Sequence, residues 1–437
     1  MQVSAFSTAP ATMGEDVGAH AHAMTTMMTA MGQRARVAAL MLAQTPTEAK
    51  NLALTVAAAA LRTRASAVAA ANARDMQKVR GLSRSMQDRL WLDEARIEAM
   101  AQGLEDIAAL PDPIGTVLDA WTRPNGLRIS RVRVPLGVIG IIYESRPNVT
   151  ADSGGLCLKS GNAALLRGGS ESFQSSQAIM QCLAEGLAVA GLPADALQMV
   201  PTTDRAAVGM MLSMVGVIDV IVPRGGKSLI ERLMAESQVP LFQSLEGICH
   251  TYVHTDANLA KAQSVVLNAK MRRTGICGAT ETLLVDRAVA AEMLPAILGD
   301  LITAGCEIRG CPETLALESR AIVATSADWR SEYLEAILSV KVVSDLEEAI
   351  NHINTYGSHH TDSILTENVA AAEWFMTKVD SAITLHNAST QFADGGEFGM
   401  GAEIGISTGK LHARGPIGVE QLTSFKYKIR GDGQIRS

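Results

Sequence analysis

Cys277 is the residue in this sequence whose surroundings point most clearly to chemistry. It lies in RRTGICG, residues 272–278, between Gly275 and Gly278 and shortly after two arginines. The thiolate is the reactive form of cysteine, and neighbouring cations lower the pKa of a thiol. The glycines leave room for an acyl group, and the backbone amide of Cys277 could donate to an oxyanion. The competing interpretation is an ordinary buried cysteine that behaves as a small hydrophobe.

Two other segments place cations and glycines between a buried strand and a helix. They are LKSGNAALLRGGSES at 158–172 and VIVPRGGKSLIERL at 220–233. Ligands of parallel sheets bind at the carboxyl ends of strands, where helix N-termini attract phosphate. The candidate cofactor-binding residues are Lys159, Gly161, Asn162, Arg167, Gly168, Gly169, Ser170, Pro223, Arg224, Gly225 and Gly226.

Arg167 suits a bidentate contact with a ribose 2′-phosphate. The second segment resembles an anion site, but it lacks the spacing of a P-loop. Ordinary strand–helix turns are the competing interpretation of the first segment, and neither interpretation is favoured by its residues alone.

Composition narrows the class of protein. The 437 residues are 47% hydrophobic, 4% aromatic and 19% charged, with a net charge of −7. This composition favours several packed cores and argues against a nucleic-acid-binding face. Six cysteines in so long a chain indicate no disulfide framework, and no grouping predicts a metal site. No uncharged apolar run approaches about 18 residues, so no membrane span is predicted, and a reducing cytoplasm fits best.

The elements expected around these residues form two parallel α/β units. Residues 25–110 are predicted to be helical, after a flexible tail at 1–24. Residues 127–143 alternate and then become continuously apolar, which predicts an exposed antiparallel strand followed by a buried parallel one. Strand and helix patterns then alternate up to 255 and again from 257 onward, with Cys277 near the start of the second series. Such alternation is typical of α/β domains.

From about residue 28 to its end, the chain resembles the gamma-glutamyl phosphate reductases, or glutamate-5-semialdehyde dehydrogenases, of the aldehyde dehydrogenase superfamily. The resemblance is carried by the segment around Cys277 and by IIYESRPNVTADSGGLCLKSGNAALLRGGSE, VIVPRGG, CHTYVH, VVSDLEEAINHINTYGSHHTDSI, DSAITLHNAST and DGGEFGMGAEIGISTGKLHARGPIGVEQLTSFKYKIRG. It implies two Rossmann-like parallel α/β domains and a small β oligomerisation element. The expected parts are a tail at 1–24, a cofactor-binding domain at 25–122 and 140–255, a catalytic domain at 256–408, and the oligomerisation element at 123–139 and 409–437.

The resemblance also implies a function. The enzyme would use NADPH to reduce L-glutamyl 5-phosphate to L-glutamate 5-semialdehyde, with release of phosphate, as the second step of proline biosynthesis from glutamate. Cys277 would form a thioester. The protein would be a cytoplasmic homo-oligomer with no nucleic-acid or membrane partner. Contact with glutamate 5-kinase, the source of the acyl phosphate, is left open.

Residue roles follow from the matching motifs. Many relatives place an oxyanion-donating asparagine after Pro-Trp, where this chain has YESRPN. Asn148 is therefore a candidate oxyanion donor, and Glu144 is the alternative occupant of that place. The candidates for binding substrate carboxylate or phosphate are Glu144, Arg146, Arg273, Asn387 and Ser389, with Arg224 as a further one. Structural ion pairs or turns are the competing interpretation of the arginines and of Asn387.

One difference from the superfamily pattern bears on whether the acyl group is transferred to water or to phosphate. Hydrolysing members of the superfamily carry a glutamate base where this chain has Ser244, in SLEGICH, and Glu246 lies two positions further on. Loss of the base suits an enzyme whose acyl group goes to phosphate instead of water. The alternatives are a hydrolysing aldehyde dehydrogenase and, from another class, a catalytically silent scaffold or cofactor-binding partner of the kinase.

Overall fold

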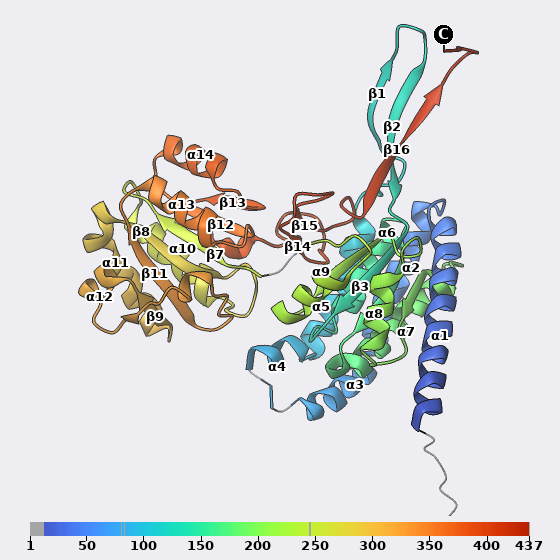
Figure 1. Ribbon diagram of the computed structural model, residues 1–437, viewed down its shortest axis with the longest axis horizontal. Helices are drawn as coiled ribbons and strands as arrows, with labels where there is room; N and C mark the ends of the chain where they lie inside the picture. The colour runs from blue at the N-terminus through green and yellow to red at the C-terminus, as the bar shows by residue number, and fades with distance from the viewer. Residues whose placement is uncertain (1–12, 80, 83, 244–245, 437) are drawn as a thin grey trace, which may run out of the picture.

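The computed structural model describes residues 13–79, 81–82, 84–243 and 246–436. Within these residues, two parallel sheets form the centres of two α/β units, and an antiparallel sheet projects from one of them (Figure 1). The predicted α/β class with parallel sheets is therefore confirmed. Cys277 precedes a strand of the second unit.

The first unit is built on a four-stranded parallel sheet. Its strand order is β5 (Leu197–Met199), β4 (Ala163–Gly168), β3 (Val138–Tyr143) and β6 (Val220–Arg224). All residues of β3 and β4 are buried, as expected for parallel strands covered on both faces. The helices of this part of the chain are α1 (Met13–Leu42), α2 (Thr47–Thr63), α3 (Ala65–Lys78), α4 (Arg84–Leu90), α5 (Glu94–Ala109), α6 (Val149–Lys159), α7 (Phe173–Val189), α8 (Ala206–Ser213) and α9 (Lys227–Glu236).

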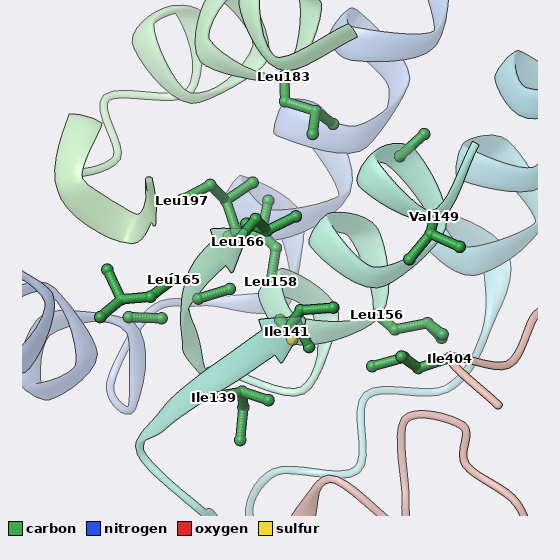
Figure 2. Close-up of a cluster of buried hydrophobic side chains, with 14 of the residues drawn as sticks. Ile139, Ile141, Val149, Leu156, Leu158, Leu165, Leu166, Leu183, Leu197 and Ile404 are labelled. Atoms are coloured by element: carbon green, nitrogen blue, oxygen red, sulfur yellow. The ribbon is translucent and has the colours of Figure 1, made fainter. Parts of the chain in front are cut away.

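The core of this unit joins strands and helices through aliphatic side chains. Figure 2 shows Ile139 and Ile141 of β3 beside Leu165 and Leu166 of β4 and residues of α6 and α7. Ile404, far along the chain, packs into the same core. The segment around it is therefore held against the first unit, close to the carboxyl ends of β3 and β6.

The second unit contains a seven-stranded parallel sheet. Its strand order is β10 (Ile322–Val323), β9 (Glu307–Gly310), β11 (Ile337–Val343), β8 (Thr280–Asp286), β7 (Cys249–Val253), β12 (Thr361–Leu365) and β13 (Ile383–His386). Its helices are α10 (Leu259–Met271), α11 (Arg287–Thr303), α12 (Pro312–Leu317), α13 (Leu346–Tyr356) and α14 (Val369–Lys378).

The third sheet is antiparallel and stands away from both units in Figure 1. It consists of β1 (Val117–Thr122), β2 (Arg128–Pro135) and β16 (Thr423–Arg430), with β2 in the middle. The predicted change from an exposed antiparallel strand to a buried parallel one is confirmed at β2 and β3. A short pair, β14 (Ile406–Ser407) and β15 (Gly415–Pro416), lies between the last parallel strand and β16.

Three predicted boundaries need correction. Helix α1 begins at Met13, inside the predicted tail, and residues 1–12 lie outside the described part of the chain. Strand β1 belongs to the projecting sheet although the prediction placed it in the cofactor-binding domain. Strand β7 pairs with β8 and β12, so the second unit begins before residue 249 instead of at 256. Periodicity identifies a strand but not its partners, which is why the boundaries at β1 and β7 were wrong.

The C-terminal part of the prediction also changes. Ile417, Val419 and Leu422 are buried in the core of the first unit, so only β16 extends the projecting sheet. No single helix in the described ranges is both long and apolar enough to cross a membrane, and the α2–α3 pair passes that test only in combination, with a bend of 70°.

Candidate active site

Cys277 lies between two cavities, in the turn that joins α10 to β8. The large cavity, of about 550 Å³, is lined by residues of both α/β units. The small cavity, of about 220 Å³, reaches the turn that joins β6 to α9. Cys277, Arg89, Arg146 and Arg224 line both cavities. A nucleophile in this place can contact one ligand from each side.

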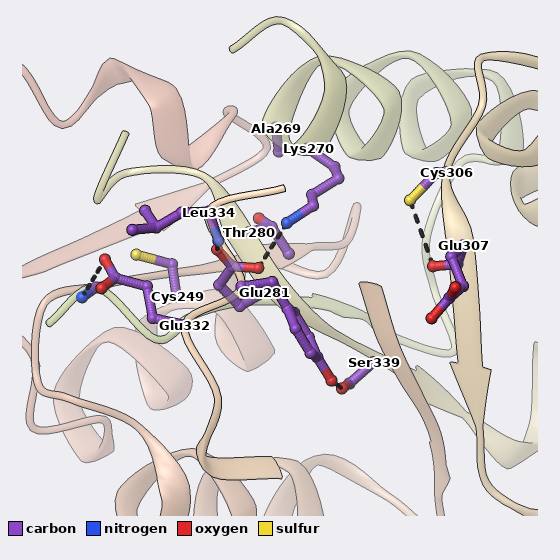
Figure 3. Close-up of polar contacts among 12 residues, drawn as sticks. Cys249, Ala269, Lys270, Thr280, Glu281, Cys306, Glu307, Glu332, Leu334 and Ser339 are labelled. Atoms are coloured by element: carbon purple, nitrogen blue, oxygen red, sulfur yellow. Dashed lines mark hydrogen bonds and ion pairs between the residues drawn. The ribbon is translucent and has the colours of Figure 1, made fainter. Parts of the chain in front are cut away.

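A buried ion pair fixes the two ends of the Cys277 turn. Lys270, at the end of α10, lies 2.5 Å from the Glu281 carboxylate in β8, and both side chains are fully buried (Figure 3). The backbone amide of Leu334 also donates to Glu281, at 3.2 Å. Removing one partner of such a pair is strongly destabilising, because the other charge stays buried. The pair therefore anchors the reactive turn to the second sheet.

Several arginines surround Cys277 without carboxylate partners. Arg146 and Arg224 make no side-chain hydrogen bond or ion pair within the described residues, and the buried Nε of Arg224 has no partner. Arg89 donates to the carbonyl of Gly275 at 2.6 Å. Burial, followed by the neighbouring guanidiniums, lowers the pKa of Arg146 to about 9, so it remains a cation at neutral pH. Unpaired cations beside a nucleophile form a site for an anionic substrate.

The large cavity also has an acidic side, formed by Asp106, Asp152, Asp394, Glu397 and Glu403. Burial raises the pKa of Asp152 to about 6, and Asn148 donates to its carboxylate at 2.9 Å. Arg272 and Arg273 line the same cavity. A ligand that carries both an ammonium group and anionic groups fits this distribution of charge.

The surroundings of Cys277 lower the pKa of its thiol. Burial alone would raise its pKa, but the His360 imidazole, followed by Arg224 and Arg146, lowers it below the ordinary thiol value. The other five cysteines are buried. The cations that lower the pKa of Cys277 are His360, Arg224 and Arg146, and not the two arginines next to it in sequence.

The β6–α9 turn has the features of a nucleotide phosphate site. Helix α9, of ten residues, begins after Gly226, and Gly226 provides no side-chain cap. The Glu144 carboxylate accepts the Gly226 amide, so the amides open to an anion begin at Lys227. A Cβ at Gly226 would meet no atom, which leaves the backbone open to a ligand. Pro223, Arg224, Gly225, Gly226 and Lys227 line the small cavity with Cys277. These residues fit the pyrophosphate of a dinucleotide.

The residues of the other predicted cofactor segment, 158–172, lie at the two opposite ends of β4. Arg167, Gly168, Gly169 and Ser170 lie at the carboxyl end of the strand, as predicted. In contrast, Lys159, Gly161 and Asn162 precede β4 and lie at the opposite edge. Lys159 donates to Asn51 and to the Ala108 carbonyl, and Asn162 contacts Gly137 and Leu422. These three residues hold the first unit together and are not brought to the site.

Some of the residues predicted to bind substrate line the large cavity, and others do not. Arg146 and Arg273 line the large cavity, and Asn148 does so with its amide already bonded to Asp152. Asn387 bonds twice to Thr366 at a turn with φ of 55°, and Ser389 accepts the Gln391 amide; neither lines a cavity described above.

Glu144 and the residues near the missing base lie on the cofactor side. The Glu144 carboxylate lies against Gly225 instead of in the large cavity. Glu246 lines the small cavity with its carboxylate bonded to Lys227 at 2.9 Å. Ser244, the counterpart of the superfamily base, lies outside the described residues.

The sequence analysis missed three residues near Cys277, which are Arg89, Glu332 and His360. Arg89 lies on a short helix, and neither Arg89 nor Glu332 belongs to a motif identified from the sequence. Glu332 lines the small cavity and accepts the Gly247 amide at 2.9 Å. His360 directly precedes β12 and lies in VVSDLEEAINHINTYGSHHTDSI, a segment that carries the resemblance, which was the available signal.

Comparison with known proteins gives the family. Residues 4–303 match the aldehyde dehydrogenase family. The gamma-glutamyl phosphate reductases of Rhodospirillum rubrum and Paramagnetospirillum magneticum are 67% and 65% identical to this chain, each over 94% of it and over 96% and 97% of their own lengths. The crystal structure of gamma-glutamyl phosphate reductase from Thermotoga maritima is 42% identical, covers 94% of this chain and 100% of its own, and superposes with a TM-score of 0.90. The chain therefore belongs to the aldehyde dehydrogenase family, and within it to the gamma-glutamyl phosphate reductases.

Proposed function

We propose that this chain uses NADPH to reduce L-glutamyl 5-phosphate to L-glutamate 5-semialdehyde, releasing phosphate, through a thioester on Cys277. Membership of the family makes the chain an oxidoreductase with a nicotinamide cofactor. The observation that carries the finer proposal is the reactive thiol set between the unpaired guanidiniums of Arg146 and Arg224. The product and the phosphate release place the reaction as the second step from glutamate to proline.

The residues of the chain account for the acyl transfer. The Cys277 thiolate attacks the acyl carbon, the carbon–oxygen bond to phosphate breaks, and the leaving phosphate takes the electron pair. Arg146 and Arg224 stabilise the phosphate, because their donors have no other partner. The backbone amide of Cys277 and the free hydrogen of the Asn148 amide are the candidates for holding the oxyanion. The acidic side of the cavity, with Asp152, would bind the substrate ammonium group.

The cofactor residues follow from the two cavities. The β6–α9 turn would hold the dinucleotide phosphates at Gly225, Gly226 and Lys227, on the side of Cys277 opposite the large cavity. Glu332 lines the same cavity and can accept from a ribose hydroxyl. When bound, the reduced nicotinamide supplies the hydride that turns the thioester into the aldehyde. The first unit would then be the cofactor-binding domain and the second the catalytic domain.

A preference for NADP rests on two arginines. Arg167 lies at the carboxyl end of β4, and Arg205, which is exposed and unpaired in the described chain, lies close enough to lower the pKa of Arg167 together with burial. Two cations at this edge fit a ribose 2′-phosphate. Glu171, nearby, is engaged by the backbone amide of Ser145 at 2.6 Å.

The projecting sheet would join copies of the chain. Its strands expose large apolar side chains, among them Trp121, Phe425, Tyr427 and Ile429. Exposed apolar surface on a sheet edge is typical of an interface. We infer a homo-oligomer from this surface. Contact with glutamate 5-kinase and a cytoplasmic location stay predictions.

The reverse reaction tests the function, because the acyl phosphate is labile. Purified protein, glutamate 5-semialdehyde and NADP⁺ are mixed with and without phosphate, and reduced cofactor is followed by absorbance for wild type and Cys277→Ala. Reduction that needs both phosphate and Cys277 is expected. Reduction without phosphate would favour a hydrolysing dehydrogenase with Glu246 as its base. No reduction in any mixture would favour the scaffold interpretation.

A further inference from the structure

We propose that His360 activates Cys277, because its buried imidazole takes the thiol proton and holds the nucleophile as half of a thiolate–imidazolium pair. The inference rests on the proposed function only in taking Cys277 as the nucleophile. His360 acts through Cys277 and does not line either cavity. It is therefore an activating residue that does not touch substrate.

Three neighbouring strands bring these residues together. β12 pairs with β7, and β7 pairs with β8. His360 directly precedes β12, Cys249 begins β7, and Cys277 lies just before β8. The Cys249 thiol donates to the backbone carbonyl of Cys277 at 3.1 Å, and its sulfur lies 3.6 Å from Nδ1 of His360. Cys249 thus contacts both partners and fixes where the imidazole lies relative to the Cys277 turn.

The hydrogen bonds of the imidazole leave one nitrogen free. His360 is fully buried, and its Nδ1 lies 2.9 Å from the Thr361 hydroxyl. Because the single proton of Cys249 goes to a carbonyl, its sulfur can only accept, which favours a hydrogen on Nδ1. Nε2 then carries a lone pair in the neutral ring, and it has no partner in the described structure. Buried polar atoms are rarely left unsatisfied, so this nitrogen is available for the thiol proton.

Opposite charges face the two halves of the pair. Burial disfavours a charged imidazole, but Cys277, Glu332 and Asp362 outweigh it and raise the pKa of His360. Glu403 also interacts with His360. The Asp362 carboxylate is held by the His250 amide at 2.8 Å, by the His250 ring at 2.9 Å and by Ser381.

On the other side, Arg224 and Arg146 face the sulfur and lower the pKa of Cys277, as described above. Carboxylates around the imidazolium and guanidiniums around the thiolate together favour the charged pair over the neutral one.

The proton transfer is balanced. The Sγ–H bond of Cys277 breaks, its electron pair stays on sulfur, and the proton forms a bond to Nε2 of His360. During attack on the acyl carbon the imidazolium keeps this proton. When the aldehyde leaves, sulfur regains its electron pair and the ion pair is restored. His360 therefore sets the reactivity of the thiol without exchanging protons with substrate.

Alkylation of the free enzyme tests the pair without substrate. Wild type and His360→Gln are treated with iodoacetamide between pH 5.5 and 9.5, and modification of the Cys277 peptide is followed by mass spectrometry. The pH midpoint of the rate is expected to rise by roughly one unit in the variant, which is about a tenfold slower alkylation at pH 6.5. An unchanged midpoint in a folded variant would overturn the proposal.

His359→Asn is the matched control. His359 is the neighbouring histidine, half-buried, with φ of 60° and its ring bonded to the Asp380 carbonyl. Asparagine tolerates this left-handed backbone, so the variant should fold. Its alkylation midpoint is expected to equal that of wild type, and a shift as large as that of His360→Gln would overturn a specific role for His360.

If His360→Gln does not fold, a titration of His360 itself tests the pair. The imidazole of His360 is titrated by NMR in wild type and in Cys277→Ser. Loss of the thiolate is expected to lower the pKa of His360 by about as much as loss of the imidazole raises the midpoint of Cys277, because the coupling is reciprocal. An unchanged histidine titration would overturn the pair. Neither arm uses turnover, so failure of the proposed reaction and failure of this inference give different results.

Discussion

Arg167 and Arg224 come from nearly identical sequence segments, and the fold uses them differently. Arg167 is the last residue but one of β4 and Arg224 is the last residue of β6, and both precede two glycines and a helical turn. Arg167 donates to the Gly168 carbonyl at 2.8 Å and to the Thr203 carbonyl at 2.7 Å. Arg224 makes no side-chain hydrogen bond within the described residues, and it lines both cavities with Cys277.

Strand order explains the difference. β4 lies inside the sheet, beside β5, and the loop after β5 supplies the Thr203 carbonyl. β6 is an edge strand whose carboxyl end meets the cavities shared with the second unit. Arg167 has two nitrogens bonded to backbone carbonyls and a buried Nε without a partner, so it mainly stabilises the fold. Arg224 has no bonded nitrogen in the described chain, so its whole guanidinium can bind an anion. Identical sequence context therefore does not give identical roles.

Replacing Arg224 gives the largest expected effect. Arg224→Gln removes a free cation beside the nucleophile, so kcat/KM for phosphate in the reverse reaction should fall by about 100-fold, or ~2.7 kcal/mol. The urea midpoint should stay the same or rise, because a partly buried charge that has no partner in the described chain is removed. Arg224→Lys, which keeps the charge, should recover part of the activity. Lower stability with unchanged phosphate kinetics would show that Arg224, like Arg167, mainly stabilises the fold.

Replacing Arg167 should show the opposite pattern. Arg167→Gln loses two bonds to backbone carbonyls, so the free energy of unfolding should fall by about 2 kcal/mol. The reverse-reaction kcat/KM for phosphate should change less than threefold, on the order of 0.6 kcal/mol. Urea unfolding and phosphate kinetics on the same preparation check both values. A loss of phosphate kinetics without a loss of stability would remove the distinction between the two arginines.

The sequence predicted the elements of this fold better than their association. The apolar run of β3 and the following helices were predicted correctly, and Cys277 was selected as a candidate, because their patterns are local. The assignment of β7 to the second sheet depends on pairing with β8 and β12, which lie 30 or more residues further along the chain. The wrong domain boundary followed from this.

Candidate site residues that belong to one local motif were predicted, whereas those that come from distant segments were missed. Cys277, Arg146 and the β6–α9 turn carried local signals. Arg89, Glu332 and His360 come from a helix, a loop and a strand start that only the tertiary structure brings to Cys277. Lys159 and Asn162 show the converse, since a motif was recognised but half of it lies at the amino edge of the sheet.

The carboxylates of the large cavity also differ in the donors that bond to them. Glu403 and Asp394 accept backbone amides of Gly395 and Gly396, whereas the one donor to the Asp152 carboxylate among the described residues is Asn148. Burial raises the pKa of Asp152 from 3.8 to about 6. The folded state thus holds this proton more tightly than the unfolded state does. The stability it contributes is fully present below pH 4 and is lost as pH rises through about 6.

Asp152→Asn should therefore stabilise the protein above pH 6, by about 1 to 2 kcal/mol, and have little effect near pH 4. Urea unfolding at pH 4.5 and pH 8 measures the difference. If Asp152 binds the substrate ammonium group, the variant should also raise KM while it gains stability. A variant that is less stable than wild type at pH 8 would show that neighbouring groups stabilise the Asp152 carboxylate in the fold.

Replacing Arg205 should give the smallest effect of these predictions. Arg205 makes no side-chain bond in the described chain, whereas the neighbouring Arg167 donates to two carbonyls, so the two arginines can be compared directly. Arg205 is exposed, so its contact with a 2′-phosphate should contribute on the order of 1 kcal/mol, which is about a fivefold preference for NADP⁺ over NAD⁺. Arg205→Ala should weaken NADP⁺ binding by that factor and leave NAD⁺ binding and the urea midpoint unchanged. Fluorescence titrations at low and high salt measure both affinities, and the difference should shrink with salt. Equal weakening for both cofactors would instead place Arg205 near the pyrophosphate, and the 2′-phosphate would then depend on the remaining donors of Arg167.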